Sequence, residues 1–340
     1  MRLMQHKKEA YWFYRFLSIF YDDLVNPLFW TVPMREKALA IAGLDGPDAE
    51  KLRVIDVGSG TGFTTEGIVE KVPAKRVVSV DQSPHQMAKA EAKESLRGVR
   101  FKLGDAEDVP AKTNHYDRYV SAGSIEYWPH PAQGIREAYR LVKPGGRATV
   151  IGPIEPQTRW GRFLANTWML FPKETDYRRW YEAAGFENVE VAYLDPGWWT
   201  GADGHHFALA IAGDKPADGP TQSPPIEEPQ DADTEGLGGG LYSAARIIAG
   251  SLAGGAFIPM ALGAKAIAAV RGSDDPREPI TPAQKAVLVG IGVAAAAALV
   301  ALIAGGGRDR SGAIASLADA AGEGPWPESP DPRRGTHPAH

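Results

Sequence analysis

The chain has 340 residues, of which 44% are hydrophobic, with no cysteine and a formal net charge of -5. This hydrophobic fraction permits a full core, and the lack of cysteine excludes disulfides, thiolate chemistry and Cys-ligated zinc. Lys and Arg form no run longer than a few residues, although phosphate binding needs them clustered. We therefore expect no nucleic-acid partner, and we predict no metal site.

Residues 1–45 form the first predicted unit, a set of helices rich in aromatic residues. The aromatic side chains are Tyr11, Trp12, Phe13, Tyr14, Phe16, Phe20, Tyr21, Phe29 and Trp30. This composition suits three roles: a cap over an apolar acceptor, contact with a membrane interface, or ordinary packing against a sheet.

The segment 54–63 is the most informative part of the chain. Its β-branched start predicts a buried strand, and the alternating glycines Gly58, Gly60 and Gly62 permit a sharp turn that comes close to a ligand. Helix-forming positions follow, so free N–H groups at the start of a helix would face that ligand. Asp56 would lie at the carboxyl end of the strand, the usual ligand edge of a doubly wound sheet, although a turn residue at the strand end is the alternative.

More strands are predicted after this turn, at 76–80, 101–105, 116–122 and 147–151. The first of them is followed by Asp81, whose carboxylate suits the two hydroxyls of a ribose. The second ends on Asp105, which suits either an adenine amino group or the N-cap of a helix. The segment 141–146 ends a helix with a Pro-Gly-Gly breaker before the last strand.

The order of these elements resembles the class I S-adenosylmethionine-dependent methyltransferases. The resemblance implies an α/β, Rossmann-like fold over residues 46–213, with a mostly parallel seven-stranded sheet and helices on both faces. A nicotinamide oxidoreductase is the alternative, but its fingerprint places the last glycine further out than Gly62.

A narrower resemblance runs through residues 5–210. The segments that carry it are 8–18, 81–86, 104–108, 117–129 and 168–174. They resemble the plant and algal 2-methyl-6-phytyl-1,4-hydroquinone methyltransferases of plastids. The resemblance implies C-methylation of prenylated hydroquinones with phytyl or solanesyl tails, in tocopherol and plastoquinone synthesis. It also implies S-adenosylmethionine as co-substrate, and a prenylated hydroquinone and a lipid bilayer as partners.

The same resemblance implies which residues hold the methyl donor. Asp56 and the turn backbone would meet its methionine end, Asp81 its ribose and Asp105 its adenine. The full expected set is Asp56, Gly58, Ser59, Gly60, Asp81, Gln82, Asp105, Ala106, Ser121 and Ala122.

Carbon methylation of a hydroquinone requires an electron-rich ring, which a base or hydrogen-bond acceptor at the phenol oxygen provides. Glu126 and Tyr127 follow the fourth strand, where acceptors enter this fold, and are the first candidates. His205 is the third candidate for a catalytic role. His85 and His206 are further possibilities, and all of these side chains also suit structural or surface positions.

The composition changes beyond residue 213. Residues 214–240 are rich in Pro, Gly, Asp and Glu, which predicts a linker too polar to form a core. Two uncharged apolar stretches, 247–264 and 286–307, each approach the ~20 residues that cross a bilayer. We expect the units 241–270 as a transmembrane anchor, 271–285 as a polar connector, 286–307 as a second transmembrane helix and 308–340 as a disordered tail. A soluble Ala-rich hairpin is the alternative, but neither stretch has a polar face.

Two other functions compete with the hydroquinone prediction. One is methylation of another prenyl quinol or a sterol, which the segment 124–128 disfavours because it matches the hydroquinone family densely. The other is a non-catalytic, membrane-tethered protein that binds S-adenosylmethionine, which the intact residues of the glycine turn disfavour. The resemblance implies the chloroplast inner envelope membrane, although no Ser- and Arg-rich leader is visible before the domain.

Overall fold

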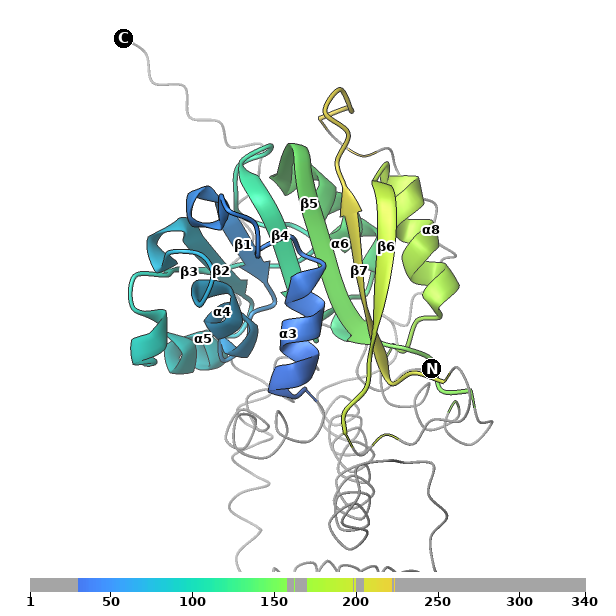
Figure 1. Ribbon diagram of the computed structural model, residues 1–340, viewed down its shortest axis with the longest axis horizontal. Coiled ribbons are helices and arrows are strands. Elements are labelled where there is room, and N and C mark those ends of the chain that lie inside the picture. The colour runs from blue at the N-terminus through green and yellow to red at the C-terminus, as the bar shows by residue number, and fades with distance from the viewer. Residues whose placement is uncertain are drawn as a thin grey trace, which may run out of the picture.

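A computed structural model describes residues 30–157, 162, 170–197, 199, 205–221 and 223. Seven strands of this part form one sheet in the order β3-β2-β1-β4-β5-β7-β6 (Figure 1). The strands are β1 (Val54–Val57), β2 (Val77–Asp81), β3 (Arg100–Leu103), β4 (Tyr116–Ala122), β5 (Val142–Pro153), β6 (Glu187–Leu194) and β7 (Ala208–Asp214). Strands β1 to β5 are parallel, and β7 is antiparallel to both β5 and β6. The predicted mostly parallel, seven-stranded sheet is confirmed.

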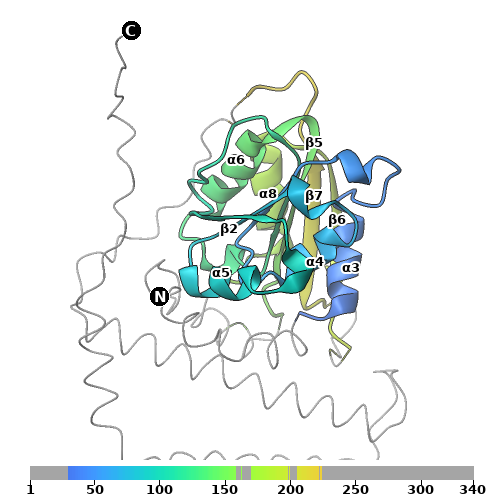
Figure 2. The same cartoon turned by 90° about the vertical axis from the view of Figure 1, so that its left-hand side faces the viewer.

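Helices cover both faces of this sheet. Figure 2 shows α3 and α4 on one side and α6 and α8 on the other. The helices are α3 (Val32–Ala40), α4 (Phe63–Val69), α5 (Pro84–Glu91), α6 (Pro131–Leu141) and α8 (Glu174–Ala184). Short 3₁₀ turns lie at η2 (Ala49–Lys51), η3 (Ala74–Arg76), η4 (Glu94–Leu96) and η5 (Ile125–Tyr127). The chain therefore has the three-layer arrangement of a doubly wound fold.

Burial on both faces explains why β1 forms where it does. All four of its residues are buried. Ile55 and Val57 pack in the cluster that contains the α6 and α8 side chains, whereas Val54 packs with residues of α3 and α4. A strand covered on both faces reads as a near-continuous apolar run, and here Asp56 interrupts that run. The turn that follows β1 lies at the edge of the sheet where the parallel strands end, here called the carboxyl edge. Because β1 is a central strand, this turn lies near the middle of that edge.

The segment 141–146 differs from the sequence-based prediction in one respect. Helix α6 ends at Leu141, as predicted, but β5 begins at once with Val142 and runs through the Pro-Gly-Gly breaker. The register with β4 shifts there, and Gly145 has a φ of 76°. The backbones of Gly145 and Gly146 each bond to Lys215, which continues the ladder from β7. Backbone pairing with Lys215 therefore keeps the Pro-Gly-Gly segment in the strand, although its sequence alone predicts a turn.

A buried lysine fastens the chain just after β7, at the opposite, amino edge of the sheet. The Lys215 ammonium donates to Asn114 Oδ1 at 2.7 Å, Tyr139 O at 2.9 Å and Thr221 O at 3.1 Å. Burial lowers the pKa of Lys215 to about 8. These bonds hold the segment that leaves β7 against the end of α6.

Several predicted units lie outside the described residues. They are residues 1–29 of the aromatic unit, most of the 214–240 linker, both apolar stretches and the tail. Within the part of the chain that the structure does describe, none of the helices has the length and apolarity to cross a bilayer. The domain boundaries and the transmembrane helices stay predictions.

Candidate active site

The glycine turn follows the carboxyl end of β1 and is hydrogen-bonded to the carboxyl end of β2. Gly58, Gly60 and Gly62 have φ values of 71°, 57° and 86°, a region that side chains with a Cβ rarely adopt. The N–H groups of Gly58 and Ser59 both donate to Val80 O, at 2.7 and 3.1 Å. The turn is therefore fixed to the neighbouring strand, and its backbone lies open to a ligand without a Cβ in the way.

Asp81 holds this turn from the end of β2. Its Oδ2 accepts from Gly60 N at 2.8 Å, and its Oδ1 accepts from Ser83 N at 2.7 Å. Burial raises the pKa of Asp81, while these two backbone N–H groups oppose that shift. Each oxygen retains a second lone pair for a ligand hydroxyl. Gln82, the other predicted ribose neighbour, is half-buried beside it.

Asp56 contributes a buried acceptor at the end of β1. Its Oδ2 accepts from Thr65 Oγ1 at 2.6 Å, whereas its Oδ1 has no hydrogen-bond partner among the described residues. Burial, with a smaller contribution from the nearby Asp81, raises the pKa of Asp56 to about 7 against the hydrogen bond from Thr65. A buried carboxylate oxygen without a partner favours a cationic donor such as an ammonium group.

Gln86 is a site residue that sequence reasoning missed. It is 2% exposed, and in the described part of the chain its Oε1 has no partner. That oxygen lies 2.8 Å from the point where a Cβ on Gly60 would stand. The available signal was the cap of α5: Ser83 Oγ accepts from Gln86 N, which places Gln86 in the first turn facing the glycines.

The loop after β4 packs directly on the glycine turn. A Cβ on Gly58 would stand 2.4 Å from the Cβ of Ser124. Ser124 Oγ is in turn 2.8 Å from the hydroxyl of the buried Ser121, one of the predicted site residues. Ala122 ends the same strand and is half-buried. The structure thus brings together Gly58, Ser121 and the loop that leads to η5.

Glu126 lies in η5, and its Oε2 has no partner among the described residues. It is 8% exposed, and burial raises its pKa from the ordinary value of 4.5 to about 7. Its carbonyl accepts from Leu170 N at 3.1 Å, and Tyr127 is buried in the same turn. A carboxyl group that exchanges its proton near neutral pH is suited to general acid–base chemistry.

Asp105 and Ala106 follow β3 by two and three residues and are half-buried. Asp105 Oδ1 accepts from Glu107 N at 2.9 Å in a short turn, and no helix begins there, so the alternative role as a helix N-cap is wrong. Contact with an adenine stays a prediction for both residues.

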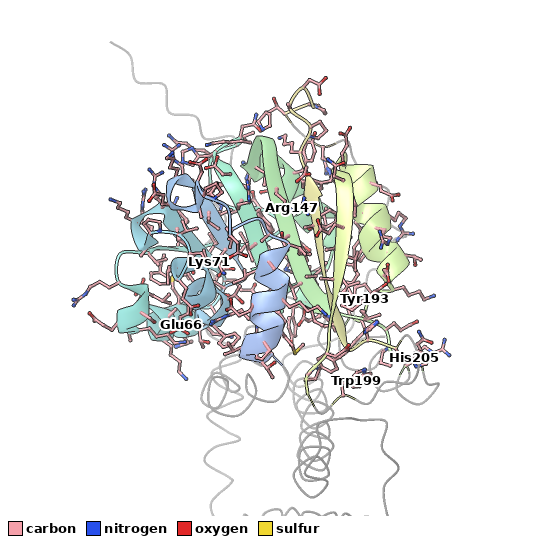
Figure 3. All side chains as sticks on the ribbon, in the orientation of Figure 1. Glu66, Lys71, Arg147, Tyr193, Trp199 and His205 are labelled. Carbon is pink, nitrogen blue, oxygen red and sulfur yellow. The ribbon has the colours of Figure 1, made fainter. Side chains whose placement is uncertain are left out.

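Of the candidate histidines, His205 and His206 lie just before β7, and His85 lies on α5. His205 is half-buried beyond β6, near Tyr193 and Trp199 (Figure 3), and its carbonyl accepts from Trp199 Nε1 at 2.9 Å. His206 Nδ1 lies 2.7 Å from Asp195 Oδ2, a pairing that the sequence did not indicate. His85 is exposed on α5. His205, just before β7, is thus separated from the glycine turn after β1 by the width of β4 and β5.

The hydrogen-bond acceptors of this site fit S-adenosylmethionine as a ligand. The unpartnered oxygens of Asp56, Gln86 and Glu126 are all acceptors, and two of them belong to carboxyl groups. A ligand with an ammonium group, hydroxyls and a sulfonium offers donors and positive charge to such a set. The glycine turn would hold its methionine end, and the methyl group would be supplied to the acceptor side.

We expect Asp81→Ala to weaken S-adenosylmethionine binding by about 2–3 kcal/mol, because two hydroxyls lose a charged acceptor. The variant also frees the N–H of Gly60, so the turn itself loses a restraint. Calorimetric titration of the folded variant checks this, with the exposed Asp48→Ala as control. Unchanged affinity would remove the ribose assignment.

Comparisons with known proteins agree with this geometry. The methyltransferase domain family model matches residues 55–150. The chloroplastic 2-methyl-6-phytyl-1,4-hydroquinone methyltransferase of Arabidopsis thaliana is 54% identical over 231 residues, covering 67% of this chain and 68% of that protein. The protein of the same name from Spinacia oleracea is 51% identical over 234 residues, covering 67% of each chain. The ubiquinone/menaquinone biosynthesis C-methyltransferase UbiE of Sinorhizobium fredii is 28% identical over 200 residues, covering 48% of this chain and 78% of that protein. The chain is therefore an S-adenosylmethionine-dependent methyltransferase, and it belongs to the 2-methyl-6-phytyl-1,4-hydroquinone methyltransferase family.

Proposed function

We propose that the protein methylates a ring carbon of 2-methyl-6-phytyl-1,4-hydroquinone and of its solanesyl analogue, and so serves tocopherol and plastoquinone synthesis. The observation that carries this proposal is the identity of more than half the residues with relatives of that name over two-thirds of the chain. The acceptors gathered around the glycine turn support it.

The donor side requires little beyond positioning. When bound, S-adenosylmethionine supplies an electrophilic methyl group, whose bond to sulfur breaks as the bond to the ring carbon forms. Asp56 would hold the ammonium of the methionine end, and the turn backbone would fix the direction of approach. Exclusion of water is aided by the packing of Ser124 on Gly58.

The acceptor side needs a group that takes the phenolic proton. We assign this role to Glu126, because its unpartnered oxygen lies in the loop that packs on the glycine turn. Removal of the proton from the hydroxyl raises the electron density on the adjacent ring carbon. After methylation, that carbon loses its hydrogen as a proton and the ring becomes aromatic again. Tyr127 is the second member of this assignment.

A different prenyl quinol is the second candidate acceptor. The similarity to a ubiquinone/menaquinone C-methyltransferase favours it within the same reaction class, although the identity there is only 28%. A protein that binds S-adenosylmethionine without turnover is the remaining alternative.

One assay separates these functions. The purified chain is incubated with methyl-labelled S-adenosylmethionine and, in parallel, the phytyl hydroquinone, the solanesyl hydroquinone and a demethylmenaquinol. We expect label on a ring carbon of the first two. Label confined to the third would favour the other quinol. Calorimetric binding of the donor with no label in any acceptor would identify a non-catalytic protein.

The membrane attachment is a further part of the proposal. The uncharged stretch 247–264 is flanked by Arg246 and Lys265 and is close to the length that crosses a bilayer. The relatives carry the word chloroplastic in their names. Together these points support a place on the plastid inner envelope membrane, with the catalytic domain outside the bilayer.

Truncation before Leu241 is expected to release the protein from membranes while it still binds S-adenosylmethionine, because the described fold, including the segment held by Lys215, ends at residue 223. Flotation with liposomes of plastid lipid composition measures the release, and removal of only 308–340 is the matched control. A truncated form that floats like the full chain would assign attachment to another segment.

A further inference from the structure

A second group of polar side chains lies at the carboxyl edge, beyond β6 and away from the glycine turn. We call His206, Asp195, Tyr193 and Glu174 the β6 cluster. The His206 ring stacks on the Tyr193 ring, with centroids 4.1 Å apart and planes at 11°. Tyr193 donates to Glu174 Oε2 at 2.7 Å, and Glu174 Oε1 accepts from Arg178 at 2.8 Å. Figure 3 shows Tyr193 at this edge, close to Trp199 and His205.

Asp195 determines how the imidazole of His206 can act. Asp195 Oδ2 lies 2.7 Å from His206 Nδ1, and Asp195 Oδ1 accepts from the backbone N–H of Phe207 at 2.7 Å. A carboxylate beside Nδ1 favours the tautomer that carries its proton there. Nε2 then offers a lone pair, and it has no hydrogen-bond partner in the described part of the chain. The His206 side chain is 31% exposed, so a ligand can reach it.

The β6 cluster and Glu126 belong to one continuous wall. Backbone hydrogen bonds join the intervening segments side by side along the carboxyl edge. They run from Leu170 N to Glu126 O (3.1 Å), from Glu155 N to Pro172 O (3.0 Å) and from Ile154 N to Phe207 O (3.2 Å). An acceptor that lies along this wall can therefore meet Glu126 and His206 together.

The separation suits the two ends of a hydroquinone. Glu126 follows β4, whereas His206 precedes β7 and stacks on β6, two to three strands away. With strands about 4.8 Å apart, that separation is about 10–14 Å. The two oxygens of a 1,4-hydroquinone are about 5.5 Å apart, and a hydrogen bond of about 2.8 Å at each end brings the span to about 11 Å.

We propose that His206, held by Asp195, accepts a hydrogen bond from the second hydroxyl of the hydroquinone, the one away from the methylated carbon. This assignment rests on the proposed function and on Glu126 taking the first hydroxyl. His206 is then the residue that distinguishes a 1,4-hydroquinone from a monophenol with the same tail. Asp195 is a positioning residue.

The test compares two acceptors in one enzyme. One is the 2-methyl-6-phytyl hydroquinone, and the other is its analogue without the second hydroxyl. We expect the wild-type protein to favour the hydroquinone about 10-fold in kcat/KM, as one hydrogen bond allows. His206→Phe keeps the ring stacked on Tyr193 but removes both nitrogens. It should raise KM for the hydroquinone to the value for the analogue and remove the preference.

Matched variants separate recognition from structure. His205→Phe changes the neighbouring side chain, while its carbonyl still accepts from Trp199, and should keep the preference. His206→Gln offers an amide oxygen as acceptor and should restore part of it, even if His206→Phe fails to fold. Three results would overturn the proposal. The preference for the hydroquinone could persist in a folded His206→Phe, it could be lost equally in His205→Phe, or His206→Gln could fail to restore it. No methylation of either acceptor by the wild-type chain would instead contradict the proposed function.

Discussion

Glu126→Gln is expected to lower kcat by a factor of ~10²–10⁴ while S-adenosylmethionine binds as before. The carboxyl group acts as charge develops on the ring, so its loss falls on turnover rather than on binding of the donor. Single-turnover transfer of labelled methyl to the hydroquinone measures the effect, and calorimetry measures donor binding. Glu182→Gln, an exposed change on α8, is the control. Turnover at the wild-type rate in Glu126→Gln would place the activating group elsewhere.

The same substitution should alter stability in a pH-dependent way. Burial raises the pKa of Glu126 from 4.5 to about 7, so the folded chain holds a proton that the unfolded chain has already released. Stability from this group is therefore fully present below pH 4.5 and is lost as the pH rises through about 7. A tenfold change in proton affinity corresponds to about 1.4 kcal/mol, so the loss amounts to a few kcal/mol. Denaturant unfolding should show that the free energy of unfolding of Glu126→Gln, relative to that of the wild type, is higher at pH 8 than at pH 5. If this difference between the two proteins is the same at both pH values, Glu126 is not a buried carboxyl group that titrates.

Gly58→Ala is expected to abolish measurable donor binding and to destabilise the fold by about 2–4 kcal/mol. The added Cβ would stand 2.4 Å from the Ser124 Cβ, in a backbone region that alanine adopts only with strain. The turn or the β4 loop must then move, and both contribute to the site. Thermal unfolding and calorimetric titration measure the two effects.

Gly145→Ala provides a matched control for that change. Gly145 has a similar φ of 76°, but a Cβ there would meet nothing within 4 Å. It should show only the cost of backbone strain, about 1–2 kcal/mol, with donor binding intact. Adding Ser124→Gly to Gly58→Ala should recover part of the lost stability, since the clashing atoms are gone. Equal effects of the two alanine variants would mean that the contact with Ser124 is unimportant.

The central part of the fold and site could be predicted because its signals are local. The buried run before Gly58 and the acids at the ends of the first two strands each follow from a few adjacent residues. Ser124 and the pairing of His206 with Asp195 could not, since each depends on segments that only the folded sheet brings together. Gln86 was missed although the cap of α5 by Ser83 was a local signal for it. The start of β5 was misplaced because its Pro-Gly-Gly segment finds its backbone partner at Lys215, just after β7 and far along the chain.

The hydrogen bonds of Lys215 also limit how the catalytic domain could be oriented relative to a membrane, if the protein is anchored as proposed. They fix the departure of the chain at the amino edge, visible above β5 and β7 in Figure 1, whereas Glu126 lies at the opposite edge. The 12 residues of β5 make the sheet about 40 Å tall. Residues 224–240 reach at most about 58 Å when fully extended. If the following segment is fixed in a bilayer, the catalytic edge can face the same surface only when this connection runs alongside the domain for most of its height. In a protein anchored as proposed, the length of this connection would decide whether a prenyl chain can pass directly from the lipid to the enzyme.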